Sequence, residues 1–194
     1  MILPIVAYGD PVLKKQGEEI DRDYPGLKEL IANMFDTMYH AKGVGLAAPQ
    51  VGKSIRLFIV DAVPFADDED EELEPGEVEF LKNFKRVFIN ARILSEDGEL
   101  WKFNEGCLSI PKIREDVLRQ PDIEMTYQDE NFKTHKETFT GMAARIIQHE
   151  YDHVDGKLFT DRISPLRKRL IKGKLLDISK GKVQTDYKMR FPLK

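Results

Sequence analysis

Two histidines four residues apart, His149 and His153, lie in a His-Glu-x-x-His segment. On an α-helix, residues four apart share a face, so both imidazoles can bind one divalent metal ion. Glu150 lies one step round the helix, close enough to reach a water molecule on that metal. Half of the 4 histidines in the chain fall in this pattern, which favours a metal site over two surface histidines that share a face by chance.

Two histidines do not complete a catalytic metal site, which usually has about three protein ligands and one position for water. One class of metalloprotease continues with His-x-x-Gly-x-x-His, and this chain has Gly156 but Phe159 in place of the third histidine. Another class uses a later glutamate, and no glutamate follows Glu150. We therefore expect the third ligand upstream.

Composition limits the class of protein. The chain has 194 residues, of which 41% are hydrophobic and 33% charged, as in an ordinary soluble domain. It has no apolar run long enough to span a membrane and no secretory signal at its start. Its single cysteine, Cys107, excludes an intramolecular disulfide. These features predict a cytoplasmic protein that has no membrane partner.

Apolar spacing predicts the elements that position this chemistry. Residues 1–22 look irregular, and a core helix is expected from Pro25 to a stop at Gly43. Thr140 is expected to cap the helix that carries the two histidines. Strands are expected at 54–60, 86–94, 113–119, 123–127 and 133–139.

Two further segments have distinct compositions. Residues 67–79 hold nine acidic and no basic residues, which predicts a solvated loop, with calcium binding as the weaker alternative. Ser164 and Pro165 predict the start of a last helix. Its apolar side is expected to consist of Leu166, Leu170, Ile171 and Leu175.

A run of small residues, 43–52, follows the first helix and has Gln50 as its one polar side chain. Small residues let the backbone approach a ligand closely, and the alternative is a tight turn between helix and strand. A phosphate-binding loop is excluded because no Gly-Lys-Ser/Thr follows.

Three segments together, 43–50, 105–109 and 148–153, resemble the motifs of the peptide deformylases in their order and spacing. Enzymes of that family remove the formyl group from the N-terminal methionine of new bacterial proteins. We expect one catalytic domain over residues 1–194, of α+β class, with antiparallel sheets packed around a central metal-binding helix. The acidic stretch 67–79 looks like an insertion, and 164–180 like a basic C-terminal helix.

The resemblance implies that Cys107, His149 and His153 bind the metal and that Glu150 is the general acid and base. The native metal would be Fe²⁺, with Zn²⁺, Ni²⁺ or Co²⁺ as substitutes. The residues support this chemistry, because a metal lowers the pKa of its bound water to about 7 in good zinc sites. Glu150 can then accept the proton and deliver it to the departing amine.

The resemblance also implies that the Gln50 side chain and the Leu108 backbone N–H stabilise the oxyanion. Gly45 would contact the substrate backbone. Arg145 departs from the expected pattern, because it places a charge where an apolar pocket wall is expected. The residues expected to bind the formyl-Met substrate are Val44, Gly45, Met142, Arg145 and Ile146.

Two other functions remain as alternatives. A general metallopeptidase would need a downstream third ligand, which the chain lacks. A non-catalytic metal-stabilised module would need a closed site of four protein ligands. With one cysteine a Cys₂His₂ set is impossible, and Glu150 would have no function there.

The C-terminal part of the chain is basic. From Lys157 to Lys194 there are twelve Lys or Arg and three Asp, a net charge of +9 against −4 for the whole chain. This asymmetry suggests a polyanionic partner, which we expect to be the ribosome, where formyl-Met first emerges. The alternative is a merely solvated helix face. We expect a monomer, and we expect removal of residues 165–194 to weaken ribosome binding while leaving turnover of a short formyl peptide largely intact.

Overall fold

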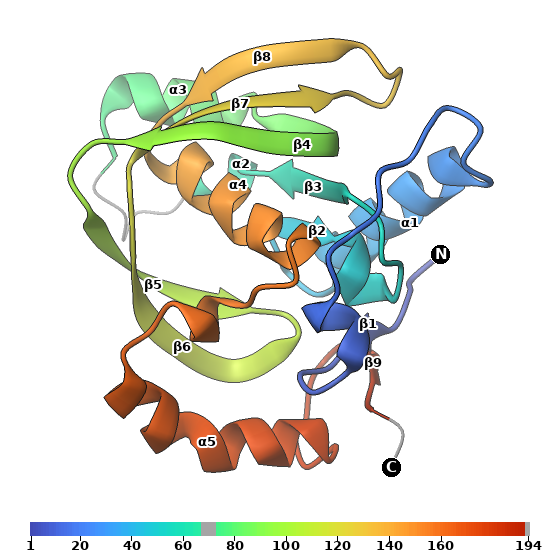
Figure 1. The fold of residues 1–194 in the computed structure, drawn as a ribbon, viewed down its shortest axis with the longest axis vertical. Coiled ribbons are helices and arrows are strands. Elements are labelled where there is room, and N and C mark those ends of the chain that lie inside the picture. Colours follow the sequence, from blue (N-terminus) through green and yellow to red (C-terminus); the bar gives the residue numbers. More distant parts are fainter. Residues whose placement is uncertain (67–72, 193–194) are drawn as a thin grey trace.

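Helix α4 (Gly141–Val154) runs through the middle of the molecule, between a five-stranded sheet and a two-stranded hairpin (Figure 1). The computed structural model describes residues 1–66 and 73–192. The strands of the sheet, in order, are β2 (Gly45–Ala47), β3 (Leu57–Asp61), β4 (Lys85–Asp97), β7 (Asp122–Gln128) and β8 (Thr134–Phe139). The hairpin consists of β5 (Trp101–Cys107) and β6 (Ile110–Arg119). Antiparallel pairing throughout both sheets confirms the predicted α+β class.

The strands follow the alternation that the sequence predicts. In β7 every second side chain is buried, as it is along most of β6, so one face of each strand packs inward. The strand predicted at 54–60 begins later, at Leu57, because Ile55 makes only an isolated bridge to Glu18. The hairpin strand β5 was not among the predicted strands.

Helix α1 (Leu27–His40) begins later than predicted. Gly26 has φ 71°, a left-handed conformation that cannot belong to the helix, so Pro25 precedes the helix instead of starting it. The helix also ends before Gly43. Along the described chain, residues 1–22 are not wholly irregular, because they contain β1 (Ile5–Val6) and the 3₁₀ helix η1 (Pro11–Lys14).

The acidic stretch contains a helix, so the loop prediction is wrong for residues 75–79; residues 67–72 lie outside the described part of the chain. A short helix, α2 (Val63–Ala66), precedes it, and α3 (Pro75–Lys82) begins with proline at its first turn. The Glu77 carboxylate accepts a hydrogen bond from Met142 N at 2.7 Å. Thr140 holds the N-cap position of α4 without a side-chain cap bond, so the predicted cap is supplied by Glu77.

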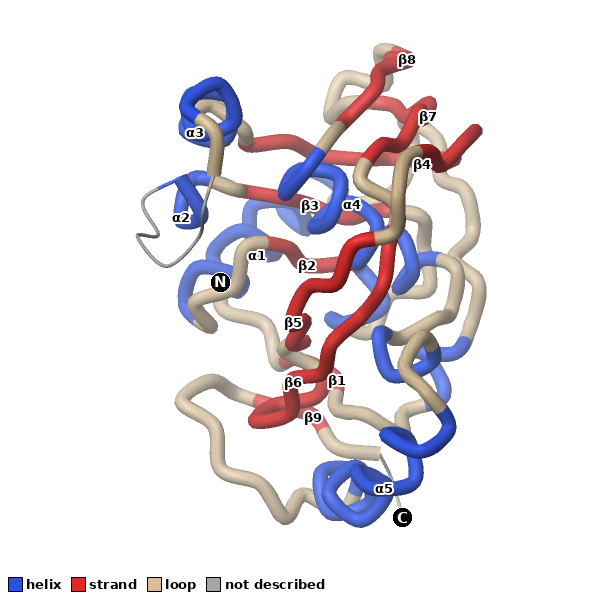
Figure 2. Tube along the Cα trace, turned by 90° about the vertical axis from the view of Figure 1, so that its left-hand side faces the viewer, coloured by secondary structure: helices blue, strands red, loops and turns tan. Residues whose placement is uncertain are grey.

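Helix α5 (Pro165–Ser179) begins as predicted, with Ser164 Oγ accepting from Arg167 N at 3.3 Å. Its buried side differs from the prediction, since Leu166 and Leu170 are 63% and 62% exposed. The predicted Ile171 and Leu175 are buried, and together with Ile178 they pack against the hairpin and the N-terminal segment. Figure 2 shows α5 at the same end of the molecule as β1 and β9 (Met189–Arg190), which pair in parallel. No described helix is long and apolar enough to cross a membrane.

Candidate metal centre and active site

Cys107, at the end of β5, meets His149 and His153 of α4. One ligand atom from each of the three residues lies within 4.8 Å of the other two. Cys107 Sγ is 3.3 Å from His153 Nε2. Ligands that share one metal at about 2.0–2.3 Å have such separations, so the structure brings the three predicted ligands together.

The orientation of His149 is fixed by Glu105. His149 Nδ1 donates to Glu105 Oε2 at 2.9 Å, which leaves Nε2 free to face the other ligands. Arg119 binds Glu105 through two hydrogen bonds of 2.7 and 3.0 Å, and Arg145 adds a third of 2.9 Å. Burial raises the pKa of Glu105, but the hydrogen bonds from Arg119 and His149 lower it well below its usual range. Glu105 is therefore an ionised anchor for the imidazole.

The two histidines of the cluster differ in protonation. Burial lowers the pKa of His153 to about 3, so its imidazole is neutral, the form that binds metals. Burial also lowers the pKa of His149, but hydrogen bonds with Cys107 and Glu105 raise it well above its usual value, so a metal would compete with this proton. One thiol and two imidazoles are a donor set that suits a divalent transition metal.

Glu150 lies buried against the small-residue segment. Burial raises the pKa of its carboxyl to about 7. Its Oε2 is buried and has no hydrogen-bond partner among the described residues. A Cβ placed on Gly45 would lie 2.4 Å from Glu150 Oε1, so only glycine leaves room for this carboxyl. Gly43 likewise allows Leu108 to approach, since a Cβ there would lie 2.8 Å from Leu108 Cδ1.

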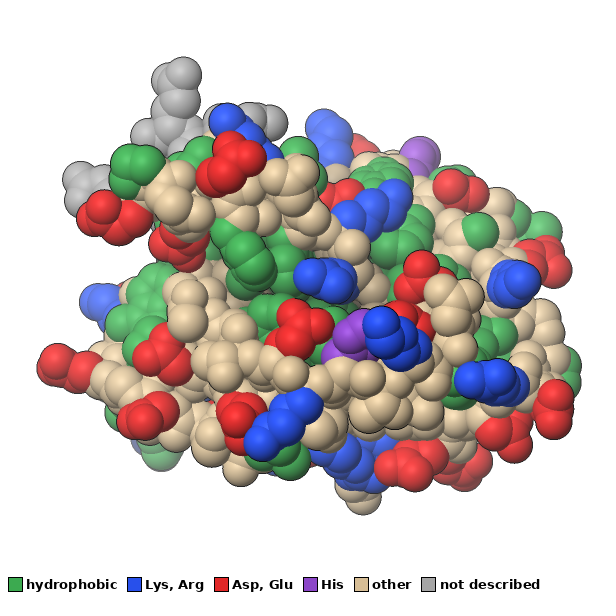
Figure 3. Space-filling view, turned by 90° about the horizontal axis from the view of Figure 1, so that it is seen from above, with side chains coloured by type: hydrophobic (Ala, Val, Ile, Leu, Met, Phe, Trp, Pro, Cys, Tyr) green, Lys and Arg blue, Asp and Glu red, His purple; other side chains and the backbone are tan. Residues whose placement is uncertain are grey.

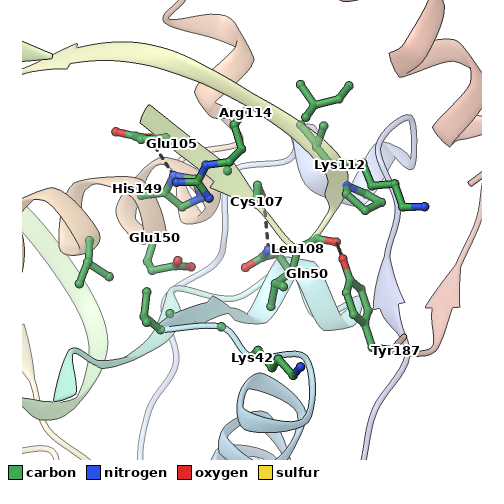
Figure 4. A pocket seen from close by; sticks show the side chains of 18 of the residues that line it. Lys42, Gln50, Glu105, Cys107, Leu108, Lys112, Arg114, His149, Glu150 and Tyr187 are labelled. Carbon is green, nitrogen blue, oxygen red and sulfur yellow. Dashed lines mark hydrogen bonds and ion pairs between the residues drawn. The ribbon is translucent and has the colours of Figure 1, made fainter. Parts of the chain in front are cut away.

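Gln50 points its amide N–H at the ligand cluster (Figure 4). It lies in the 3₁₀ helix η2 (Ala48–Val51), and its Oε1 accepts from Ala47 N at 2.8 Å, which fixes the side chain. Nε2 lies 3.4 Å from Cys107 Sγ and 3.3 Å from Ser109 Oγ. The small-residue segment thus provides a donor as well as a close backbone approach.

A cavity of about 680 Å³ opens above these groups. It is lined by the catalytic candidates and by residues predicted to bind substrate, which are Val44, Gly45, Met142, Arg145 and Ile146. The Arg145 guanidinium is occupied elsewhere, because it bonds Glu105 and the carbonyls of Val117 and Trp101 and stacks 4.2 Å from the Trp101 ring. Arg145, the charged residue in a wall that was expected to be apolar, therefore helps to hold Glu105 in place.

Reasoning from the sequence assigned no role to Glu105, Arg119 or Tyr187. Glu105 had a detectable signal, because it lies two residues before Cys107 and so shares its face of the strand. Arg119 and Tyr187 had none, since Arg119 reaches Glu105 through the pairing of β5 with β6, and Tyr187 reaches Leu108 from a segment far along the chain. The phenol of Tyr187 bonds Leu108 O at 2.8 Å, across 79 residues of sequence.

Known proteins resemble this chain in sequence and in structure. The model of the polypeptide deformylase family matches residues 2–169. The chain belongs to the polypeptide deformylase family. A peptide deformylase of Christiangramia forsetii is 64% identical over 192 residues, which cover 99% of this chain and 97% of the relative. One of Flavobacterium johnsoniae is 60% identical, over 98% of this chain and 96% of the relative.

Solved structures agree with the family assignment. A peptide deformylase from Legionella pneumophila superimposes with a TM-score of 0.78 and 36% identity, over 94% of this chain and 98% of that one. A peptide deformylase from Thermotoga maritima superimposes with a TM-score of 0.72 and 39% identity, over 85% of this chain and 99% of that one. The chain is thus a metal-dependent hydrolase that removes the N-terminal formyl group from formyl-methionine of newly synthesised proteins. A general metallopeptidase and a non-catalytic module are excluded.

Proposed function

We propose that Cys107, His149 and His153 bind one divalent metal ion on the floor of the cavity and that Glu150 is the general acid and base of deformylation. One observation carries this assignment: three ligand atoms converge within 4.8 Å of one another at a cavity that Glu150 also lines. Glu105 would hold His149 in the ligating tautomer.

The native ion in this proposal is Fe²⁺, with Zn²⁺, Ni²⁺ or Co²⁺ as substitutes. Imidazole suits all these metals, and a thiolate favours a softer ion over Mg²⁺ or Ca²⁺. When bound, the ion would polarise the formyl oxygen and make a water molecule acidic enough to react near neutral pH.

Glu150 would take a proton from the attacking water and give it to the departing amine nitrogen. A carboxyl can do both when its pKa is near the working pH, and burial raises the pKa of Glu150 to about 7. The unpaired Oε2 is available for such a transfer. Gly45 keeps the space against this carboxyl clear.

Negative charge would develop on the formyl oxygen during the attack. Gln50 Nε2 and the Leu108 backbone N–H would donate to it, and losing one such donor typically costs about 10²–10³ in rate. The fixed orientation of Gln50 supports this role, because a donor held in place beforehand needs no reorganisation.

The substrate would lie along β2. This strand is at the sheet edge, where an extended peptide can pair with the backbone at Val44 and Gly45. Met142 and Ile146, apolar residues of α4 that line the cavity, would contact the methionine side chain. Arg145 would support this wall through Glu105 instead of contacting a charged substrate.

The proposed partner of α5 is ribosomal RNA. The helix has five Lys or Arg and one Asp, and Arg169, Lys172 and Lys174 have no ion pair among residues that the structure describes. Figure 3 shows the end of the molecule opposite to α5, where acidic and basic side chains are interspersed. The concentration of positive charge on α5 favours a polyanion over a merely solvated face. We further propose one catalytic domain that acts as a cytoplasmic monomer.

The proposal is tested on protein purified without oxygen, by measuring metal content and the release of formate from a short formyl-Met peptide. We expect about one ferrous ion per chain, turnover of the formyl peptide, and much slower cleavage of its acetyl counterpart. Cys107→Ser should lower the iron content, because a hydroxyl is a poor substitute for a thiolate. Unchanged iron and turnover in this variant would contradict the ligand assignment.

A further inference from the structure

The turn that joins β5 to β6 is held by both ends of the chain. Cys107 pairs with Ile110, so the turn consists of Leu108 and Ser109 alone. Each of its two carbonyls accepts a hydrogen bond: Leu108 O from the Tyr187 hydroxyl at 2.8 Å, and Ser109 O from Tyr8 N at 2.9 Å. The turn that carries the proposed Leu108 donor is thus tied to a C-terminal anchor, Tyr187 (Figure 4), and to an N-terminal anchor, Tyr8.

The segment that carries Tyr187 is itself fixed. After α5 the chain returns to the cavity, which residues 184–187 help to line. Thr185 Oγ1 donates to Tyr187 O at 2.7 Å. Beyond it, β9 pairs with β1, and Ile5 N and Ala7 N donate to Lys188 O and Arg190 O, both at 2.9 Å. The Tyr187 hydroxyl therefore reaches Leu108 from a bend next to β9, which is fixed by its pairing with β1.

We propose that Tyr187 is a positioning residue: its hydroxyl holds the Leu108 carbonyl and thereby directs the Leu108 N–H at the reacting formyl oxygen. This inference rests on the proposed role of Leu108 in the oxyanion site. Tyr187 lies beyond residues 2–169, the part that matches the family model. The segment after α5 is thus a working part of the active site.

The physical reason lies in the geometry of the turn. The Leu108 carbonyl and N–H belong to the two peptide planes that flank one Cα, so freeing the carbonyl lets the N–H tilt. A donor must lie about 2.7–3.1 Å from the oxyanion, and a displacement of about 1 Å can cost 10²-fold in rate. The hydrogen bond from the Leu108 N–H to the formyl oxygen strengthens in the transition state. Weakening it therefore lowers kcat and leaves KM nearly unchanged.

Tyr187→Phe removes only the hydroxyl and keeps the ring. Its matched control is Tyr8→Phe, because Tyr8 holds Ser109 through its backbone N–H and its hydroxyl has no bond to a described residue. On metal-loaded protein with a formyl-Met peptide, we expect kcat to fall about 5- to 20-fold in Tyr187→Phe, with KM changed less than about 2-fold. Tyr8→Phe should retain the wild-type kcat, and both variants should match in metal content and Tm.

Amide hydrogen exchange gives a readout apart from activity. In the folded full-length protein, exchange across residues 106–110 should be faster in Tyr187→Phe than in wild type or Tyr8→Phe. Equal kcat and equal exchange in all three proteins would overturn the inference, as would a parallel loss of kcat, KM and Tm. Failure of the proposed function looks different, because the Glu150→Gln variant would then keep the turnover of the wild-type protein.

Discussion

Helices α4 and α5 have almost the same length, 14 and 15 residues, and opposite surroundings. In α4, 11 residues are buried, whereas α5 buries only Ile171, Leu175 and Ile178. A helix enclosed on all sides has few ways to move, so it can hold catalytic groups within a fraction of an ångström. A helix with one buried side presents the other to solvent and to partners.

The charges of the two helices differ in the same way. On α4, Arg145 and Asp152 are buried and paired, the first with Glu105 and the second with Arg119 and Arg162. On α5, Arg167 pairs with Glu115, while the other cations face outward. Buried pairs fix geometry at a desolvation cost, whereas exposed charges contribute little to stability and remain free for binding.

The largest effect is expected from the buried network. Arg119→Met should lower the free energy of unfolding by about 3–5 kcal/mol, because Glu105 and Asp152 are buried and each would lose one of its cationic partners. The control, Arg169→Met, removes an exposed arginine of α5 that has no ion pair among the described residues, and it should cost about 0.5 kcal/mol or less. Urea unfolding of both variants measures the difference, and equal losses would remove the distinction between the two helices.

A large loss of activity is expected from the contact between β2 and α4. Gly45→Ala would place a methyl group 2.4 Å from Glu150 Oε1, so the carboxyl must move. Displacement by about 1 Å should lower kcat/KM roughly 100-fold. Gly76→Ala is the control, since nothing lies within 4 Å of a Cβ at that position. Wild-type activity in Gly45→Ala would show that Glu150 need not occupy its observed place.

The two sides of α5 should respond differently to truncation of a leucine. Leu175 is 7% exposed, and Leu175→Ala should lower the free energy of unfolding by about 2–3 kcal/mol. Leu170 is 62% exposed, and Leu170→Ala should lower the free energy of unfolding by less than about 0.5 kcal/mol. Comparable losses in thermal or urea unfolding would mean that the outer side of α5 is covered in solution.

The smallest effect on the isolated enzyme is expected from the outer cations. Lys172→Glu with Lys174→Glu should leave unfolding and peptide turnover unchanged while weakening ribosome co-sedimentation and its dependence on salt. Charge reversal is a cleaner test than the truncation expected from the sequence. Removing residues 165–194 would also remove core residues of α5 and the Tyr187 contact. Unaltered co-sedimentation would leave the basic side as a solvated surface.

What the sequence predicted well was local. The spacing of His149 and His153 places them on one helix face, and alternation located most of the strands. The acidic composition of 67–79 concealed α3, whose single buried residue is Leu81 and whose Glu77 caps a helix 65 residues away. The acidic residues alone indicated a solvated loop. No local sequence pattern shows that one of them, Glu77, accepts a hydrogen bond from a backbone N–H far along the chain.

The supports of the site were the least predictable part. Cys107 was assigned by resemblance, and its neighbours Glu105 and Ser109 received no role although they hold His149 and contact Gln50. Arg119 reaches Glu105 only because β5 and β6 form a hairpin. Leu166 and Leu170 were expected to be buried by spacing alone, but the hairpin packs against the other side of α5.

The proposed mechanism requires Glu150 to move the proton while Cys107, His149 and His153 hold the metal. Its most direct test is Glu150→Gln, with metal content and formate release measured on the same oxygen-free preparation. We expect wild-type metal content and at least a 100-fold lower kcat, in line with the roughly 10²–10⁴-fold contribution of a general acid–base group. Turnover near the wild-type rate with full metal content would contradict it.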